Sequence, residues 1–181
     1  MFAKDGRLSE TTQIAPLAPA AFREALGHFA TGITVMTTQD EVEGRYGVTA
    51  TSFASLSLDP PLVQWSLRNA AYSLPIFIRS GRFAVNILAA DQEGVSRCFA
   101  TADVDRFAGL KIEEGLGGVP LIGGAAAWIE CALERTLPGG DHTILVGRVL
   151  RTRTFGRRPL LHWRGNYLPI EDDRHAFRRN A

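Results

Sequence analysis

The chain is poor in cysteine and has no long apolar run. Its two cysteines, Cys98 and Cys131, lie far apart and form no C-x-x-C pair, which excludes a zinc framework and a disulfide scaffold. We expect each of them to be a small buried apolar residue. No apolar stretch approaches the ~20 residues of a membrane helix, and no signal region opens the chain. These absences predict a cytoplasmic protein with no membrane partner.

Net charge is also lacking. The 20 basic and 19 acidic residues, in a chain of 181, leave a formal net charge of +1. A balance so close to neutral provides no general attraction to nucleic acid. Arginines gather only over 148–158 and 174–179, which we interpret as a solvated strand face and a tail. We therefore expect no nucleic-acid partner.

Several motifs that mark enzymes are missing. The glycines over 115–124 do not have the G-x-G-x-x-G spacing of a dinucleotide loop between a strand and a helix. Neither a P-loop nor an H-E-x-x-H motif occurs and the four histidines are dispersed, so we expect no metal. The absence of a G-x-S-x-G elbow excludes a serine hydrolase of that type.

The pattern of apolar residues predicts one domain that is mainly β with peripheral helices. We expect residues 1–19 to form a flexible arm, 20–170 the domain and 171–181 a tail. With three short helices, the strands favour an antiparallel barrel or sandwich. Residues 103–124 are predicted to be a loop. The predicted strands cover 33–38, 46–51, 62–67, 83–88, 126–137, 143–154, 160–163 and 167–170.

The three predicted helices are short. Apolar spacing places the first over about 20–32, with Gly32 as its end. Asn69 is expected to cap the second helix, which ends near residue 80. Asp91 is expected to cap the third, which ends near residue 101.

One stretch, residues 47–67, is crowded with small hydroxyl side chains. Such a segment offers many hydrogen-bond donors and little bulk, which suits a polar, flat or phosphorylated ligand. Serine and threonine also tolerate turns, so a plain connecting loop is the alternative at this point. The hydroxyl side chains between the two apolar runs are Thr49, Thr51, Ser52, Ser55 and Ser57.

Three further polar residues are candidates for a site. His142 adjoins Asp141 in a turn, where it either stacks on or hydrogen-bonds a ligand amide, or is an exposed surface residue. Asn69 either caps a helix or helps a phosphate settle on the helix N-terminus. Asn86 is the one polar residue inside an apolar strand, and a buried amide must find partners.

Five motifs in this order resemble the short-chain flavin reductases of the split-barrel flavin-binding superfamily, the reductase partners of two-component flavin-dependent monooxygenases. The resemblance covers residues 22–167. The motifs are Phe-Ala-Thr-Gly-Ile-Thr-Val at 29–35, the hydroxyl-rich stretch at 47–63, Phe-Ala-Val-Asn-Ile-Leu at 83–88, Gly-Asp-His-Thr at 140–143 and Pro-Leu-Leu-His-Trp-Arg-Gly-Asn-Tyr at 159–167.

The resemblance implies an antiparallel split β-barrel of Greek-key type and a homodimer with flavin in a groove near the subunit interface. It places His142 at the nicotinamide. The sequence departs from many relatives at 69–72, where a more hydroxyl-rich or basic run is common. The residues that the resemblance places at the flavin are Thr49, Ala50, Thr51, Ser52, Phe53, Ser55, Ser66, Asn69, Ser73, Asn86 and Arg97.

The implied function is that of an NAD(P)H:flavin oxidoreductase, which reduces FAD or FMN with NADH or NADPH and releases reduced flavin to a partner monooxygenase. We expect no catalytic general base, because hydride passes directly between two stacked rings. The alternative is a non-catalytic flavin- or haem-binding split-barrel module. A pyridoxamine-phosphate oxidase relative is disfavoured by the Gly-Asp-His motif.

Overall fold

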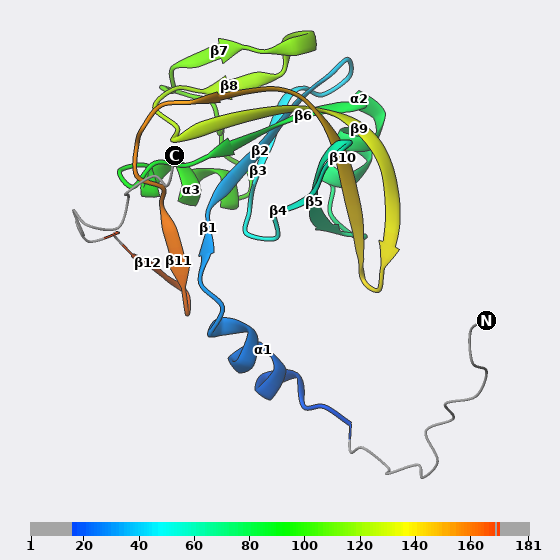
Figure 1. Ribbon diagram of the computed structural model, residues 1–181, viewed down its shortest axis with the longest axis vertical. Helices are drawn as coiled ribbons and strands as arrows, with labels where there is room; N and C mark the ends of the chain where they lie inside the picture. Colours follow the sequence, from blue (N-terminus) through cyan, green and yellow to red (C-terminus); the bar gives the residue numbers. More distant parts are fainter. Residues whose placement is uncertain (1–15, 169, 171–181) are drawn as a thin grey trace.

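Most of the described chain forms one curled antiparallel sheet. The computed structural model describes residues 16–168 and 170. Within that part of the chain, seven strands follow the spatial order β3 (Gly44–Ala50), β2 (Thr34–Asp40), β6 (Arg82–Ile87), β9 (Ala127–Gly139), β10 (His142–Thr154), β5 (Pro61–Arg68) and β4 (Ala54–Leu58). Figure 1 shows the long β9–β10 hairpin arching along one side. The predicted mainly β architecture is confirmed.

The two edges of this sheet, β3 and β4, are neighbours in the sequence. Only residues 51–53 separate the end of β3 from the start of β4. This tripeptide therefore crosses from one edge of the sheet to the other, and we call it the seam segment. A sheet whose edges meet in this way is a barrel that is closed by a connection rather than by a hydrogen-bonded ladder. The predicted antiparallel split barrel is confirmed.

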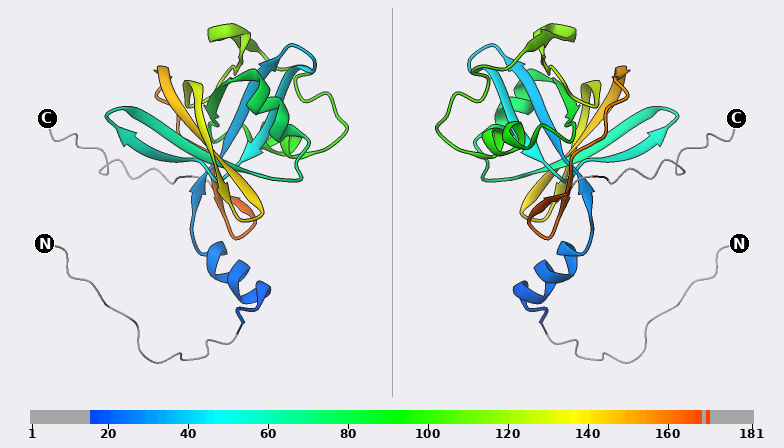
Figure 2. Two further views of the ribbon diagram at one scale, coloured as in Figure 1. Left: turned by 90° about the vertical axis from the view of Figure 1, so that its right-hand side faces the viewer. Right: turned by 90° about the vertical axis from the view of Figure 1, so that its left-hand side faces the viewer.

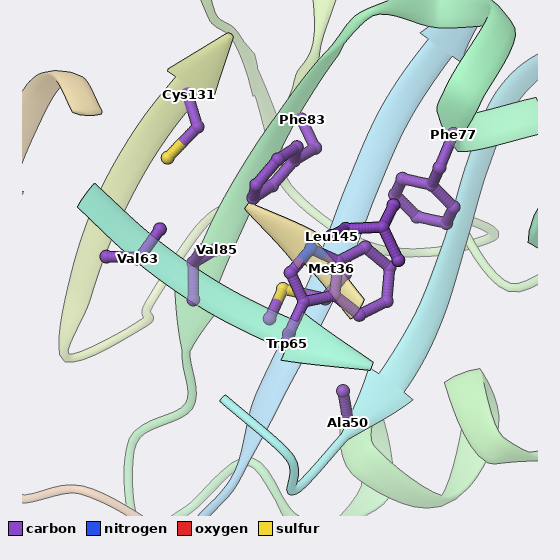
Figure 3. Close-up of a cluster of buried hydrophobic side chains, with 9 residues drawn as sticks. All are labelled: Met36, Ala50, Val63, Trp65, Phe77, Phe83, Val85, Cys131 and Leu145. Atoms are coloured by element: carbon purple, nitrogen blue, oxygen red, sulfur yellow. The ribbon is translucent and has the colours of Figure 1, made fainter. Parts of the chain in front are cut away.

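The hydrophobic core lies inside the barrel. Trp65 of β5 has no exposed surface and meets the Phe77 ring edge-on, with ring centroids 4.8 Å apart at 76°. Met36, Phe83 and Leu145 come from three other strands and pack around it (Figure 3). Large rings packed in this way remove much apolar area from water and fix the register of the strands.

Three helices lie outside the sheet within the described residues: α1 (Pro19–Gly27), α2 (Ser73–Ser80) and α3 (Glu93–Ala100). The predicted end of the first helix at Gly32 is wrong. The helix ends at Gly27 because Thr31–Gly32 forms β1, which pairs with β11 (Leu161–Trp163).

Both predicted helix caps are also wrong. The N-cap residues are Tyr72 for α2 and Gln92 for α3. Asn69 is committed elsewhere, because its side chain bonds to the turn between β9 and β10. Asp91 forms an ion pair with Arg157 instead of bonding to the helix start.

Two smaller sheets complete the described part. β1, β11 and β12 (Asn166–Leu168) form one, and β7 (Ile112–Glu114) pairs with β8 (Pro120–Ile122), with the short 3-10 helix η1 (Leu116–Gly118) between them. The prediction of a plain loop over 103–124 is therefore wrong in its second half. The sequence pattern also missed β4.

The predicted N-terminal arm and C-terminal tail lie mostly outside the described residues. The predicted arm is described only from residue 16, and the predicted tail 171–181 lies beyond the described range. In the described part, no helix combines the length and the apolar character needed to cross a bilayer.

Candidate functional site

The seam segment is a stretch of backbone that the sheet does not use. The ladder of β3 ends at Ala50 and that of β4 begins at Ala54. The peptide groups of 51–53 make no backbone hydrogen bond with other described residues. Buried or ligand-covered peptide groups need partners, so these groups are available to a polar ligand lying along the seam.

One hydroxyl fixes the position of the seam. The Ser52 Oγ accepts a hydrogen bond from the Ser66 N–H at 3.0 Å and donates to the Ser66 carbonyl at 3.2 Å. The seam segment is thus fastened to β5. The side chains of Thr51 and Ser55 are exposed and form no hydrogen bond with any described residue, so both hydroxyls are free to meet a ligand.

Three other residues predicted in this stretch make contacts inside the protein. Ala50 is buried in the core, and Phe53 is half-buried against the same cluster. The Thr49 hydroxyl donates to the Ser96 carbonyl of α3 at 2.7 Å. Its proton is therefore used inside the protein, and Thr49 joins β3 to the helix.

His142 begins β10 and lies directly opposite Arg68 of β5. Directly paired residues of antiparallel strands project from the same face of a sheet. Its Nδ1 is 2.7 Å from the Asp141 Oδ1, and this hydrogen bond is the main reason that the pKa of Asp141 is lowered. The contact holds the imidazole in one orientation.

The seam and His142 come together through β5. Ser66, which binds Ser52, is two residues before Arg68, which pairs with His142. Residues i and i+2 of a strand share a face, and their spacing is about 6.6 Å at ~3.3 Å per residue. Ser52 bonds to the Ser66 backbone on one side of β5, whereas His142 pairs with Arg68 on the other side, so the predicted flavin segment and the predicted nicotinamide residue flank the same end of β5.

Asn69 lies at the same end of the sheet. Its backbone N–H donates to the Asp141 carbonyl at 2.9 Å, and its side chain bonds to the Gly140 carbonyl and the Thr143 hydroxyl. Ser73 opens α2 four residues later and is buried. The structure thus brings Asn69 to His142 more directly than to the helix N-terminus.

The structure does not bring Asn86 to this site. Asn86 has no exposed surface, and its amide bonds to the Val35 carbonyl, the Thr37 hydroxyl and the Ile122 N–H. All of these partners are interior. We therefore correct its assignment from a ligand contact to a hydrogen-bonded core residue that joins β2, β6 and β8.

Arg97 occupies the surface of α3. It pairs with Glu93 at 2.7 Å, and its guanidinium lies 4.8 Å from the centre of the Tyr167 ring. The neighbouring Ser96 contributes the carbonyl that Thr49 contacts and a hydroxyl 3.0 Å from the Tyr167 hydroxyl. Arg97 is thus linked to the β3 end of the seam through α3.

Sequence reasoning missed a hollow beside the seam. It has a volume of about 240 Å³ and includes Thr51 in its wall. The Thr31 hydroxyl oxygen in this wall is buried and has no hydrogen-bond partner among the described residues. Most of the lining residues belong to the motifs at 29–35 and 159–167. These motifs are the sequence signal from which the hollow could have been predicted. The other lining residues are Leu26, Gly27, Phe29, His162, Arg164 and Gly165.

A larger hollow, of about 400 Å³, lies between the β2–β3 turn and the end of α2. Its main charged groups already neutralise each other, because Arg79 makes two hydrogen bonds to the Asp40 carboxylate, at 3.0 and 2.8 Å. The free donors of the seam are elsewhere. We therefore assign the candidate site to the seam.

Comparison with known proteins identifies the family. The family model described as flavin reductase like domain matches residues 26–171, which is most of the chain. The chain belongs to this flavin reductase family. The family predicted from the five sequence motifs is therefore confirmed.

Individual relatives agree. The chain is 41% identical over 157 residues to the reductase subunit HsaB of a flavin-dependent monooxygenase from Rhodococcus jostii, covering 86% of this chain and 80% of the relative. It is also 41% identical over 149 residues to a probable flavin reductase from Rhizobium meliloti, covering 82% of this chain. It spans only 48% of that relative's length.

A solved relative has the same fold. The structure of the NADH:FAD oxidoreductase SgcE6 from Streptomyces globisporus, in complex with NAD and FAD fragments, superimposes with a TM-score of 0.81 at 37% identity. The match covers 85% of this chain and 93% of that chain.

Proposed function

We propose that this flavin reductase family member is an NAD(P)H:flavin oxidoreductase. The observation that carries the proposal is the placement of the seam donors and His142 on either side of the same end of β5, at positions two residues apart along that strand. Hydride transfer requires two flat rings in contact, with no proton donor or acceptor between them. Relatives named as flavin reductase and as reductase subunit of a monooxygenase support the same activity.

The seam fits the polar edge of a flavin. The exposed hydroxyls of Thr51 and Ser55 and the peptide groups of 51–53 supply hydrogen bonds without bulk. Bound flavin supplies the hydride-accepting chemistry. Fixed donors along the seam stabilise negative charge on that edge during reduction, because they are already oriented and need no rearrangement.

His142 has a different task in this proposal. Its imidazole is oriented by Asp141 and holds the carboxamide of the nicotinamide, while Arg68 opposite provides a positive charge on the same face. No residue of this set abstracts a proton. The reacting pair is FAD or FMN with NADH or NADPH, and NADH with FAD is the first pair to test, because the solved relative is named for it.

We further propose a homodimer. α1 has no buried residue, and Phe22, Leu26 and Phe29 on it and just after it are 50%, 57% and 77% exposed. Figures 1 and 2 show α1 standing away from the barrel. An exposed apolar stripe of this kind needs a partner surface, and a second copy of the chain supplies one.

Light scattering after size exclusion tests the dimer. We expect about twice the chain mass of 19.7 kDa for the unmodified protein. Leu26→Ser weakens association, whereas Val42→Ser, at a still more exposed apolar residue in the β2–β3 turn, does not. A monomer at all concentrations contradicts the proposal.

The partner in the proposed reaction is a monooxygenase that receives reduced flavin. Thr51 and Ser52 of the seam are exposed rather than enclosed in a cavity, which suits a flavin that binds, is reduced and leaves. We place the reaction in the cytoplasm, where reduced nicotinamide is supplied.

The substitution His142→Ala tests the division of labour. We expect the Michaelis constant for the nicotinamide to rise about tenfold, the cost of one hydrogen bond with partial charge. The flavin dissociation constant, measured by quenching of flavin fluorescence, stays within about twofold. A loss confined to flavin affinity moves His142 to the flavin and contradicts the assignment.

A further inference from the structure

Asn69 makes three hydrogen bonds to one short segment of the chain. Its backbone N–H donates to the Asp141 carbonyl at 2.9 Å, and its Nδ2 donates to the Gly140 carbonyl at 3.1 Å. Its Oδ1 accepts a hydrogen bond from the Thr143 hydroxyl at 2.8 Å. The whole polar part of the residue is therefore directed at the turn between β9 and β10.

That turn is a tight hairpin connection. β9 ends at Gly139 and β10 begins at His142, so only two residues form the connection, and Gly140 has a φ of +71°. Two-residue hairpin loops commonly require such positive φ values, which glycine adopts without strain. The carbonyls of both turn residues accept hydrogen bonds from a single partner, Asn69, across from the hairpin.

The same turn orients the imidazole. Asn69 bonds to the backbone carbonyl of Asp141. The carboxylate of the same Asp141 contacts the His142 Nδ1 at 2.7 Å. Both Asp141 and Asn69 are exposed, so neither bond is protected from water on its own. Several bonds that converge on one two-residue turn nevertheless restrict it more than any one does.

We propose that Asn69 is a positioning residue for the nicotinamide site rather than a contact of the flavin phosphate. The inference rests on the proposed reductase function. It follows from where the side-chain amide points: its Nδ2 donates to the hairpin, its Oδ1 accepts from the hairpin, and the hairpin carries His142. A change at Asn69 acts on the nicotinamide through the turn.

The kinetic test uses Asn69→Ala and Thr143→Val, with FAD and NADH. Thr136→Val is the matched control, because Thr136 is an exposed threonine of the same hairpin whose hydroxyl has no partner among the described residues. We expect Asn69→Ala to raise the Michaelis constant for NADH about three- to tenfold, as for one or two neutral hydrogen bonds. The turnover number and the flavin dissociation constant stay within about twofold.

Thr143→Val shifts the same constant in the same direction, and the control leaves it unchanged. The double variant Asn69→Ala/Thr143→Val is less than additive, because both changes remove the same bond. A weaker flavin dissociation constant with an unchanged Michaelis constant for NADH overturns the proposal and returns Asn69 to the flavin.

Amide hydrogen exchange separates this proposal from the proposed function. Asn69→Ala accelerates exchange of the amides over 140–143 severalfold but not over the control strand β6. If the unmodified protein shows no flavin-dependent oxidation of NADH while this acceleration occurs, the proposed reductase function is wrong and the restriction of the turn by Asn69 is confirmed. If the protein is an active reductase and neither exchange nor the Michaelis constant changes, the positioning role is wrong.

Discussion

The interior amide of Asn86 provides a sharp test of the fold around the site. Its Oδ1 accepts a hydrogen bond from the Ile122 N–H at 2.7 Å, and its Nδ2 donates to the Val35 carbonyl at 2.9 Å. Asn86→Ala leaves the buried Ile122 N–H without its acceptor, which costs about 1–3 kcal/mol. A residual cavity of ~40 Å³ adds about 1 kcal/mol at ~24 cal/mol per Å³.

The expected loss is therefore about 2–4 kcal/mol, a large part of the about 5–15 kcal/mol typical of a domain. Urea unfolding followed by circular dichroism measures it. Asn166→Ala is the control, because Asn166 is exposed and its side chain bonds, among the described residues, only to the nearby Arg164 carbonyl. It is expected to cost less than about 0.5 kcal/mol.

Flavin affinity is measured for the same variant in the absence of urea. We expect folded Asn86→Ala to bind flavin within about threefold of the unmodified protein, because no atom of Asn86 is exposed. An unchanged urea midpoint together with a large loss of flavin affinity refutes the reasoning. That result places Asn86 at the ligand, as the sequence motif first implied.

Three further predictions concern stability and reactivity. The hydrogen bonds from Arg79 are the main reason that the pKa of Asp40 falls from 3.8 to about 2, so its stabilising effect is complete above about pH 4 and lost as pH falls through 2. Asp40→Asn therefore flattens the fall in Tm between pH 4 and 2, and a parallel fall contradicts this. Burial raises the pKa of the Cys131 thiol to about 12, so a disulfide reagent at pH 8 modifies only Cys98 in the native protein and both thiols in urea. Gly47→Ala brings a Cβ within 2.5 Å of a ring carbon of Phe99 in α3 and lowers the free energy of unfolding by about 1–3 kcal/mol. An unchanged Tm contradicts this packing.

The strands of the barrel were predictable because the core demands a continuous apolar pattern. Residues 83–88 and 143–154 are apolar or β-branched where they cross the interior, and the structure places strands β6 and β10 there. β4 was missed because its residues are largely exposed and pair on one side only, with β5. An edge strand of this kind has little apolar periodicity to detect.

The roles of individual polar residues were less predictable. Asparagine is a residue type that often caps helices. The Asn69 side chain bonds to the hairpin instead, because tertiary contacts determine its partners. Asn86 belongs to a family motif, yet its partners come from β2 and β8, which lie far from it in the sequence. A residue type predicts that a hydrogen bond forms, whereas the partner depends on the folded topology.

The seam was predicted as a hydroxyl-rich ligand segment, but its position was not. Nothing in the local sequence indicates that residues 51–53 join the two edges of the sheet, since that follows from the order of all seven strands. The free peptide groups at this point are therefore a product of the barrel topology. The contact of these groups with flavin stays a prediction.

Steady-state oxidation of NADH and NADPH, each with FAD and FMN, tests the central claim most directly. We predict that the purified protein accelerates oxidation only when flavin is added, with saturation in both flavin and nicotinamide and a clear preference for one pair. Oxidation that is no faster with protein and flavin than with flavin alone contradicts the account.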